Sequence, residues 1–205
     1  ALLECMEERQ VTVDGGTYWL AEPFMVVATQ NPLEMEGTYA LPEAQRDRFM
    51  ARISLGYPDT ASEMEMLETH QSVSPLESIV PVASVRDIAA MTAKVRDVYV
   101  SAAVKEYTVA IGAATRDHPF IRLGASPRAL LQLLRASKAR AALEGRDFVL
   151  PDDVARLAGA VLPHRLILER QALGAGETPA SLLAAVLSKV PVPRPPGARA
   201  GMARP

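Results

Sequence analysis

Three polar side chains, Asn31, Arg48 and Arg128, have residue types and sequence positions suited to phosphate chemistry. Asn31 follows the short apolar run 24–28, which predicts a strand over 24–29 that is buried on both faces. An amide at the carboxyl end of such a strand offers both a donor and an acceptor, so it can orient a water or hold a phosphate oxygen. The simpler alternative is that Asn31 begins a turn before Pro32.

Arg48 follows a glycine-containing loop and the short helical segment Leu-Pro-Glu-Ala-Gln. Its planar, permanently charged guanidinium suits bidentate contact with a γ-phosphate. The alternative is a surface salt bridge with Asp47 or Glu43. A strand, a terminal asparagine, a loop, a short helix and an arginine, in this order, are typical of the second half of a nucleotide-hydrolysing core.

Arg128 lies in the first turn of a predicted helix, because Ser126 is a good N-cap and Pro127 suits the first helical position. A cation near the positive end of the helix dipole is mildly unfavourable unless an anion is present. A helix N-terminus with an added arginine is therefore a candidate phosphate site. The alternative is a long side chain that reaches into solvent.

The motifs around these residues resemble the MoxR family of AAA+ ATPases from residue 1 to about residue 168. They are, in order, ALLECMEERQVTV, ATQNP, GTYALPEAQRDRF, GASPRA and LPHR. The resemblance implies that Asn31 is the sensor-1 residue and that Arg48 is an arginine finger for the nucleotide of a neighbouring subunit. It implies that Arg128 is the sensor-2 arginine, acting on the nucleotide of its own subunit. Arg46 stands where the family usually has an apolar residue, so it remains an alternative finger.

The sequence contains no G-x-x-x-x-G-K-[ST] phosphate loop and no apolar strand that ends in an Asp-Glu pair. In the family both motifs precede the position at which this chain begins. We therefore expect a C-terminal fragment that does not hydrolyse ATP alone. The resemblance implies that the whole ATPase binds ATP and Mg²⁺ at the subunit interfaces of a homo-oligomeric ring, a hexamer in the family. It further implies chaperone-like remodelling or maturation of partner proteins, including proteins with von Willebrand factor A domains.

The predicted fold class is α/β followed by all-α, the C-terminal part of an AAA+ P-loop NTPase core plus a helical lid. Residues 1–59 are expected to supply the pre-sensor hairpin, the sensor-1 strand and the finger segment. Residues 60–168 form the lid, and 169–205 a weakly helical and then disordered tail. Within the first part, Asp14-Gly15-Gly16 predicts a hairpin over 10–20, and a second short strand is expected at 53–57.

In the helical part, Thr60 and Glu63 predict a capping box, and the leucine and valine faces are expected to be buried. Tyr18 and Trp19 in the hairpin either contact a client protein or cover the core face of the hairpin. His164, in the LPHR segment, is interpreted as structural. No histidine or cysteine stands at ligand spacing near the acidic residues of the 34–43 loop, so we predict no metal site there.

Composition limits the possible partners. The 22 basic and 24 acidic residues nearly balance, which argues against nucleic-acid binding. No apolar stretch approaches the roughly 20 residues that span a bilayer. The single cysteine, Cys5, permits no internal disulfide, is expected to pack in a helix, and favours a reduced, cytoplasmic setting. Two alternative functions are a non-catalytic helical interaction module and a DNA- or chelatase-related AAA+ subunit.

Overall fold

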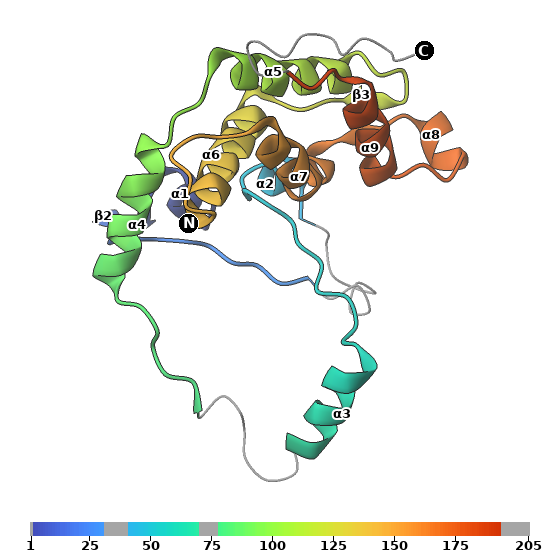
Figure 1. Ribbon diagram of the computed structural model, residues 1–205. Coiled ribbons are helices and arrows are strands. Elements are labelled where there is room, and N and C mark those ends of the chain that lie inside the picture. Colours follow the sequence, from blue (N-terminus) through green and yellow to red (C-terminus); the bar gives the residue numbers. More distant parts are fainter. Residues whose placement is uncertain (1, 31–40, 70–77, 194–205) are drawn as a thin grey trace, which may run out of the picture.

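The computed structural model describes residues 2–30, 41–69 and 78–193. Helices predominate in these ranges (Figure 1). They are α1 (Leu2–Glu8), α2 (Glu43–Arg46), α3 (Thr60–Thr69), α4 (Val85–Asp97), α5 (Ala102–Arg116), α6 (Pro127–Leu143), α7 (Pro151–Val161), the 3-10 helix η3 (Pro163–Arg165), α8 (Arg170–Gly174) and α9 (Pro179–Lys189). The strands are β1 (Gln10–Val13), β2 (Gly16–Trp19), β3 (Ile121–Leu123) and β4 (Ile167–Leu168), and they form two antiparallel pairs, β1–β2 and β3–β4.

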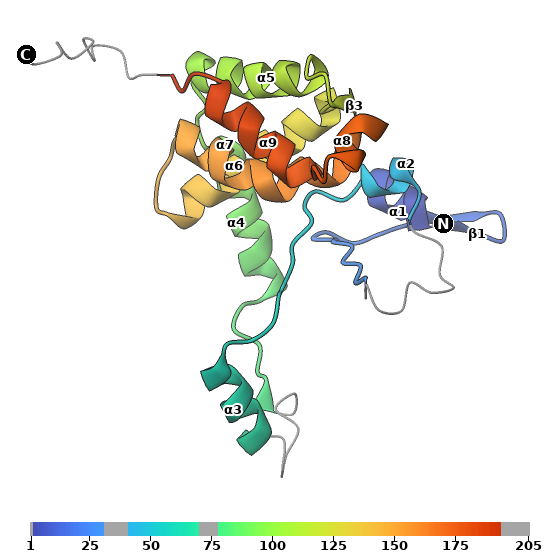
Figure 2. The ribbon, with the colours of Figure 1, turned by 90° about the vertical axis from the view of Figure 1, so that its right-hand side faces the viewer.

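The N-terminal helix and the hairpin are joined as one unit, which Figure 2 shows projecting beside the helices. Strands β1 and β2 pair from Gln10 opposite Trp19 to the turn, where Asp14 and Gly15 both have positive φ, as a two-residue hairpin turn requires. The Glu4 carboxylate of α1 accepts hydrogen bonds from the backbone N–H (3.2 Å) and the hydroxyl (2.5 Å) of Thr12. The hairpin predicted from the sequence is thus confirmed.

The hydrophobic core lies among α5, α6, α7 and α9, which we call the helical body (residues 98–190). Its largest fully buried apolar side chains come from all parts of this unit and include Ile111, Leu133, Leu162 and Leu183. Helices α5 and α6 approach closely at Gly112, where an added Cβ would lie 2.7 Å from Leu130 Cδ1. A larger residue at this crossing would therefore require the Leu130 side chain to shift.

Local signals set the helix boundaries of this body. The Ser126 hydroxyl accepts a hydrogen bond from Ala129 N–H (3.1 Å), and Pro127 is the first residue of α6. Gly145 follows the end of α6 with a φ of +73°, the left-handed conformation that terminates many helices. Pro151 begins α7 with acidic residues in its first turn. The start of α6 at Ser126-Pro127 confirms the prediction from the sequence.

The strands predicted at 24–29 and 53–57 are not formed, and these predictions were wrong for the structure described here. Their apolar side chains are exposed, among them Met25, Val27, Leu55 and Tyr57. A strand requires a neighbour to pair with its N–H and C=O groups, and no described residue pairs with either segment. An apolar run of suitable length does not form a β-strand unless another strand is present to pair with it.

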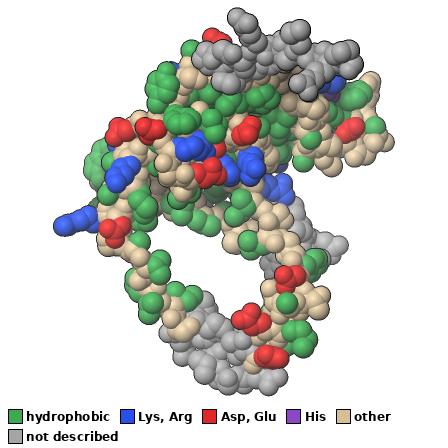
Figure 3. Space-filling view, viewed as in Figure 1, with side chains coloured by type: hydrophobic (Ala, Val, Ile, Leu, Met, Phe, Trp, Pro, Cys, Tyr) green, Lys and Arg blue, Asp and Glu red, His purple; other side chains and the backbone are tan. Residues whose placement is uncertain are grey.

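Helix α3 lies away from the helical body, whereas α4 contacts α6 at its C-terminal end, where Lys138 Nζ donates to Arg96 C=O (2.7 Å) (Figures 1 and 2). No residue of α4 is buried, and apolar side chains such as Met64, Ile88 and Met91 are exposed, so the expected burial of these faces is not observed. The predicted capping box is also corrected, since Asp59 Oδ1 accepts from Ser62 N–H (2.8 Å) and α3 begins at Thr60. Figure 3 shows hydrophobic and acidic side chains along α3, and basic and acidic side chains close together on the body.

Residues 169–193 extend the helical body beyond its predicted end at residue 168. Helix α9 packs on α5 and α7, and Leu182, Leu183 and Val186 are buried in the common core. Thr178 caps α9 by accepting from Ser181 N–H (3.0 Å), so the helix is well defined and not weak. No helix in the described ranges is long and apolar enough to cross a membrane.

We predict that Leu183→Ala lowers the free energy of unfolding of the helical body by about 2–5 kcal/mol, because the truncation leaves a cavity in a closed core. Leu143→Ala is the matched control, since Leu143 lies on α6 but is 84% exposed. It should change stability by less than about 0.5 kcal/mol. Urea unfolding followed by circular dichroism measures both, and equal effects would contradict the assignment of α9 to the core.

Candidate functional site

The segment before Arg128 is fixed to the C-terminal end of α5. Ala125 N–H donates to the hydroxyl of Thr115 (2.9 Å), and Ala125 C=O accepts from Arg116 Nε (2.8 Å). At Gly124 an added Cβ would lie 2.7 Å from the backbone nitrogen of Arg116, so this close approach requires glycine. The Gly-Ala-Ser-Pro-Arg motif therefore anchors the start of α6 and places Arg128 in its first turn.

Arg48 lies directly after α2, in a turn that continues the helix for one more step. Arg48 N–H donates to Gln45 C=O (3.2 Å), and Phe49 N–H donates to Arg46 C=O (3.2 Å). A further backbone hydrogen bond, from Arg52 N–H to Ala160 C=O (2.9 Å), connects the following residues to α7. The backbone that carries Arg48 is thus attached to the helical body.

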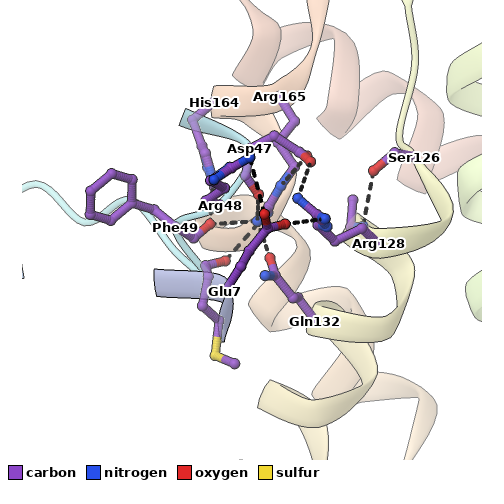
Figure 4. Close-up of polar contacts among 11 residues, drawn as sticks. Glu7, Asp47, Arg48, Phe49, Ser126, Arg128, Gln132, His164 and Arg165 are labelled. Carbon is purple, nitrogen blue, oxygen red and sulfur yellow. Dashed lines mark hydrogen bonds and ion pairs between the residues drawn. The ribbon is translucent and has the colours of Figure 1, made fainter. Parts of the chain in front are cut away.

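Arg48 and Arg128 meet at the carboxylate of Glu7 on α1 (Figure 4). Arg48 Nη2 lies 3.0 Å from Glu7 Oε2, and Arg128 Nη2 forms an ion pair with Glu7 Oε1. Arg128 Nη1 also lies 3.6 Å from Asp47 Oδ2. Two arginines that are 80 positions apart in the sequence therefore share one anionic partner, and we call them the arginine pair.

The arginine pair is open to solvent, since the side chains of Arg48 and Arg128 are 25% and 48% exposed. Ion pairs at such positions contribute little to stability, because water screens them. Two guanidinium groups at one point also repel each other unless an anion lies between them. The carboxylate of Glu7 supplies this anion and holds the two guanidinium groups together.

A buried arginine that the sequence interpretation left without a role lies beneath this pair. The side chain of Arg165 is only 2% exposed, and it contacts the backbone and side chain of Asp47. Burial lowers the pKa of Arg165, while the carboxylate of Asp47 opposes that shift. The sequence signal was the Leu-Pro-His-Arg segment, which carries the resemblance but has no obvious chemistry. Glu7 likewise lies in a motif that carries the resemblance, ALLECMEERQVTV, without an assigned role.

His164 is buried next to Arg165, and its Nε2 lies 3.1 Å from the carbonyl oxygen of Phe49. Because a carbonyl only accepts, Nε2 carries the proton in this contact. Burial lowers the pKa of His164, and the adjacent positive charge of Arg165 lowers it further. A neutral, structural histidine agrees with the interpretation from the sequence.

Of the other sequence candidates, Asn31 lies outside the described residues. Arg46, the alternative finger, faces Glu43 at 4.0 Å and lines an open pocket of about 640 Å³ beside the start of α6. Neither Arg48 nor Arg128 lines that pocket. Among the residues that the structure describes, no group of three or more His, Cys, Asp or Glu side chains is arranged to bind a metal.

Comparison with known families gives matches for both parts of the chain. Residues 1–51 match the ATPase family associated with various cellular activities (AAA), and residues 113–186 match the AAA lid domain. The glutamate and Arg48 of the site lie in the first match, and Arg128 and Arg165 in the second. The site therefore joins a segment of an AAA+ ATPase core to its lid.

The relatives identify the branch. The chain is 38% identical to chaperone MoxR1 of Mycobacterium tuberculosis over 95% of its length and 31% identical to protein MoxR of Methylorubrum extorquens over 94%. It is 45% identical to the uncharacterized protein YeaC of Bacillus subtilis over 94%. It spans 53%, 62% and 60% of these relatives, respectively. A crystal structure of a candidate ATPase from Cytophaga hutchinsonii superimposes with a TM-score of 0.87 at 38% identity, covering 94% of this chain and 61% of that one. The chain belongs to the MoxR family of AAA+ ATPases.

We predict that the chain loses stability as the pH falls from 7.5 to 5.5, in part through His164. The unfolded chain binds a proton near the ordinary histidine pKa of 6.5, whereas the folded chain, with its lowered pKa, does not. Protonation therefore favours unfolding below pH 6.5, by at most about 1.4 kcal/mol per pH unit for one group. His164→Gln should flatten this slope, and His118→Gln should not. Urea unfolding at several pH values measures the slopes, and an unchanged slope in His164→Gln would refute the assignment.

Proposed function

We propose that this chain is the sensor and lid part of a MoxR-type AAA+ ATPase whose Arg48 and Arg128 act together on one nucleotide, bound by a neighbouring subunit of a ring. The observation that supports this proposal is the convergence of both guanidinium groups on Glu7. Side chains that reach the same carboxylate also reach the same phosphate. A polyphosphate carries more charge than a carboxylate and replaces Glu7 as their partner.

The chemistry follows from charge and position. Negative charge on the transferred γ-phosphoryl group must be stabilised in the transition state, and an arginine supplied across a subunit interface contributes a factor of about 10³–10⁵ in kcat. Two arginines offer more donors than one and fix the orientation of the phosphate. Asn31 is proposed to orient the attacking water at the nucleotide of its own subunit.

ATP supplies the reactive phosphate, and Mg²⁺ neutralises its charge when bound. The described residues provide arginines for the phosphate but no cluster of metal ligands, so we assign the Mg²⁺ ligands and the phosphate loop to a part of the ATPase outside this chain. This division agrees with the fraction of the relatives that the chain spans.

The output of hydrolysis is proposed to be remodelling or maturation of partner proteins, as the name of the mycobacterial relative, chaperone MoxR1, suggests. A cytoplasmic homo-oligomeric ring, hexameric by family resemblance, and partners with von Willebrand factor A domains belong to the same proposal. The hairpin is the candidate client contact, because Tyr18 and Trp19 are both exposed.

In the whole ATPase, Arg48→Ala and Arg128→Ala should each lower kcat by about 10²-fold or more, while nucleotide affinity changes little. The fold loss in kcat of the double variant should be much smaller than the product of the two single losses, because both side chains act on one group. Arg122→Ala, an exposed arginine of β3, is the control and should retain activity.

Subunit mixing separates the shared-nucleotide arrangement from the split one. Arg48→Ala and Arg128→Ala subunits are combined in one ring, and ATP turnover is measured. If both arginines of a subunit act on the same neighbouring nucleotide, every site lacks one arginine and the mixture stays inactive. If they act on different nucleotides, some interfaces have both arginines and activity returns. Recovered turnover would therefore disprove the shared site.

For the chain 1–205 alone, we predict no ATPase activity and no ATP binding at micromolar concentrations. The arginine pair offers side-chain charges, but the backbone donors and the lysine of a phosphate loop are not present in this sequence. Isothermal titration calorimetry with Mg·ATP tests this directly. A micromolar dissociation constant would show that the chain contains a complete nucleotide site.

A further inference from the structure

We propose that Arg165 is a positioning residue for the arginine pair: it holds the segment 47–50 against the lid, so that Arg48 and Arg128 stay at one point. This inference rests on the proposed function above for its effect on turnover, but not for its effect on structure. Arg165 lies in the 3-10 helix η3, which follows α7, whereas residues 47–50 follow α2. The contact joins elements that are more than 110 positions apart in the sequence.

The guanidinium of Arg165 is surrounded by acceptors, as Figure 4 shows. Its Nε donates to Asp47 Oδ1 (3.1 Å), its Nη2 to Asp47 C=O (3.1 Å), and its Nη1 to Met50 C=O (3.3 Å). It also donates to the carbonyl oxygens of Phe49 and Val161 and to the side-chain oxygen of Gln132. A single buried side chain thus binds three backbone carbonyls of the segment 47–50. It also binds one residue of α6 and one of α7.

This set of contacts depends on arginine. The guanidinium offers five N–H donors in a rigid plane, and it bonds acceptors on several sides at once. A lysine has three donors on one nitrogen atom and cannot reach acceptors that are distributed around a plane. Partly buried carbonyl groups that lose their donor carry an energetic cost, so a lysine at position 165 would release part of the 47–50 backbone.

The contacts of Arg165 with residues 47–50 are called the clamp. Asp47 connects this clamp to both members of the arginine pair. One carboxylate oxygen accepts from Arg165, and the other lies 3.6 Å from Arg128 Nη1. Asp47 is also the residue before Arg48, so the clamp fixes the backbone from which Arg48 extends. Next to it, His164 Nε2 donates to Phe49 C=O and adds a second attachment. Displacement of this segment would therefore move Arg48 relative to Arg128.

The test compares Arg165→Lys with Arg146→Lys in the whole ATPase. Arg146 is a matched control, because it too pairs with an acidic side chain, the buried Asp153, through two hydrogen bonds (2.7 and 2.8 Å), but it does not contact residues 47–50. Both variants keep the charge and both remove a guanidinium network from the lid. Three quantities are measured: kcat, nucleotide affinity, and hydrogen exchange of the backbone amides of 48–52.

We expect Arg165→Lys to speed exchange at residues 48–52 by at least about tenfold and to lower kcat by about 10–100-fold, as small misplacements of catalytic groups do. Nucleotide affinity should stay within about twofold, because the phosphate loop dominates binding. Arg146→Lys should change neither exchange at 48–52 nor kcat. Asp47→Asn, which keeps the size of the side chain, should reproduce the Arg165→Lys pattern in weaker form and serves if the lysine variant does not fold.

An Arg165→Lys protein with unchanged exchange at 48–52 would overturn the clamp. Faster exchange with unchanged kcat would overturn its positioning role, provided that Arg48→Ala lowers kcat in the same assay. If Arg48→Ala is fully active, the proposed function fails instead, and the exchange measurement still decides whether Arg165 holds the segment.

Discussion

The buried guanidinium of Arg165 organises the region where the core segment meets the lid. Moving a charged group out of water is costly, and the cost is recovered only where several acceptors surround it. Here three of the six acceptors are backbone carbonyls of residues 47–50, which are not part of any helix or sheet ladder. The arginine therefore supplies the partners that secondary structure supplies elsewhere, and an otherwise irregular segment becomes a fixed support for Arg48.

Where the core segment meets the lid, two layers of charged side chains differ in their exposure to solvent. The lower layer contains the buried Arg165 and the partly exposed Asp47, which are joined by directional hydrogen bonds. The upper layer contains Glu7, Arg48 and Arg128, and it is accessible to solvent. Exposed ion pairs exchange partners at little cost, whereas buried ones do not. Such a division suits a site that must hold its shape while it binds and releases an anion.

Local chemistry explains what the sequence predicts well. The Asp14-Gly15 turn, the Ser126-Pro127 start of α6 and the Gly145 stop each depend on a few adjacent residues, and each is found in the structure. The strand at 24–29 depends on neighbours that these residues do not provide, and that prediction was wrong. The contact between Glu7 and Arg128 depends on how two remote elements pack, which no local pattern encodes. Arg165 was visible only as part of a motif, because burial decides its role.

Helix α1 connects the hairpin to the arginine pair. Glu4 and Glu7 lie about one helical turn apart, and the first binds the hairpin through Thr12 while the second binds the arginine pair. A helix of two turns bends little, so α1 connects the two contacts rigidly. An anion that displaces Glu7 from the arginine pair would remove one of the contacts that hold α1 in place, and the hairpin with Tyr18 and Trp19 is attached to the same helix. The partner of Glu7 is in this way linked through α1 to strand β2, which carries the two exposed aromatic side chains.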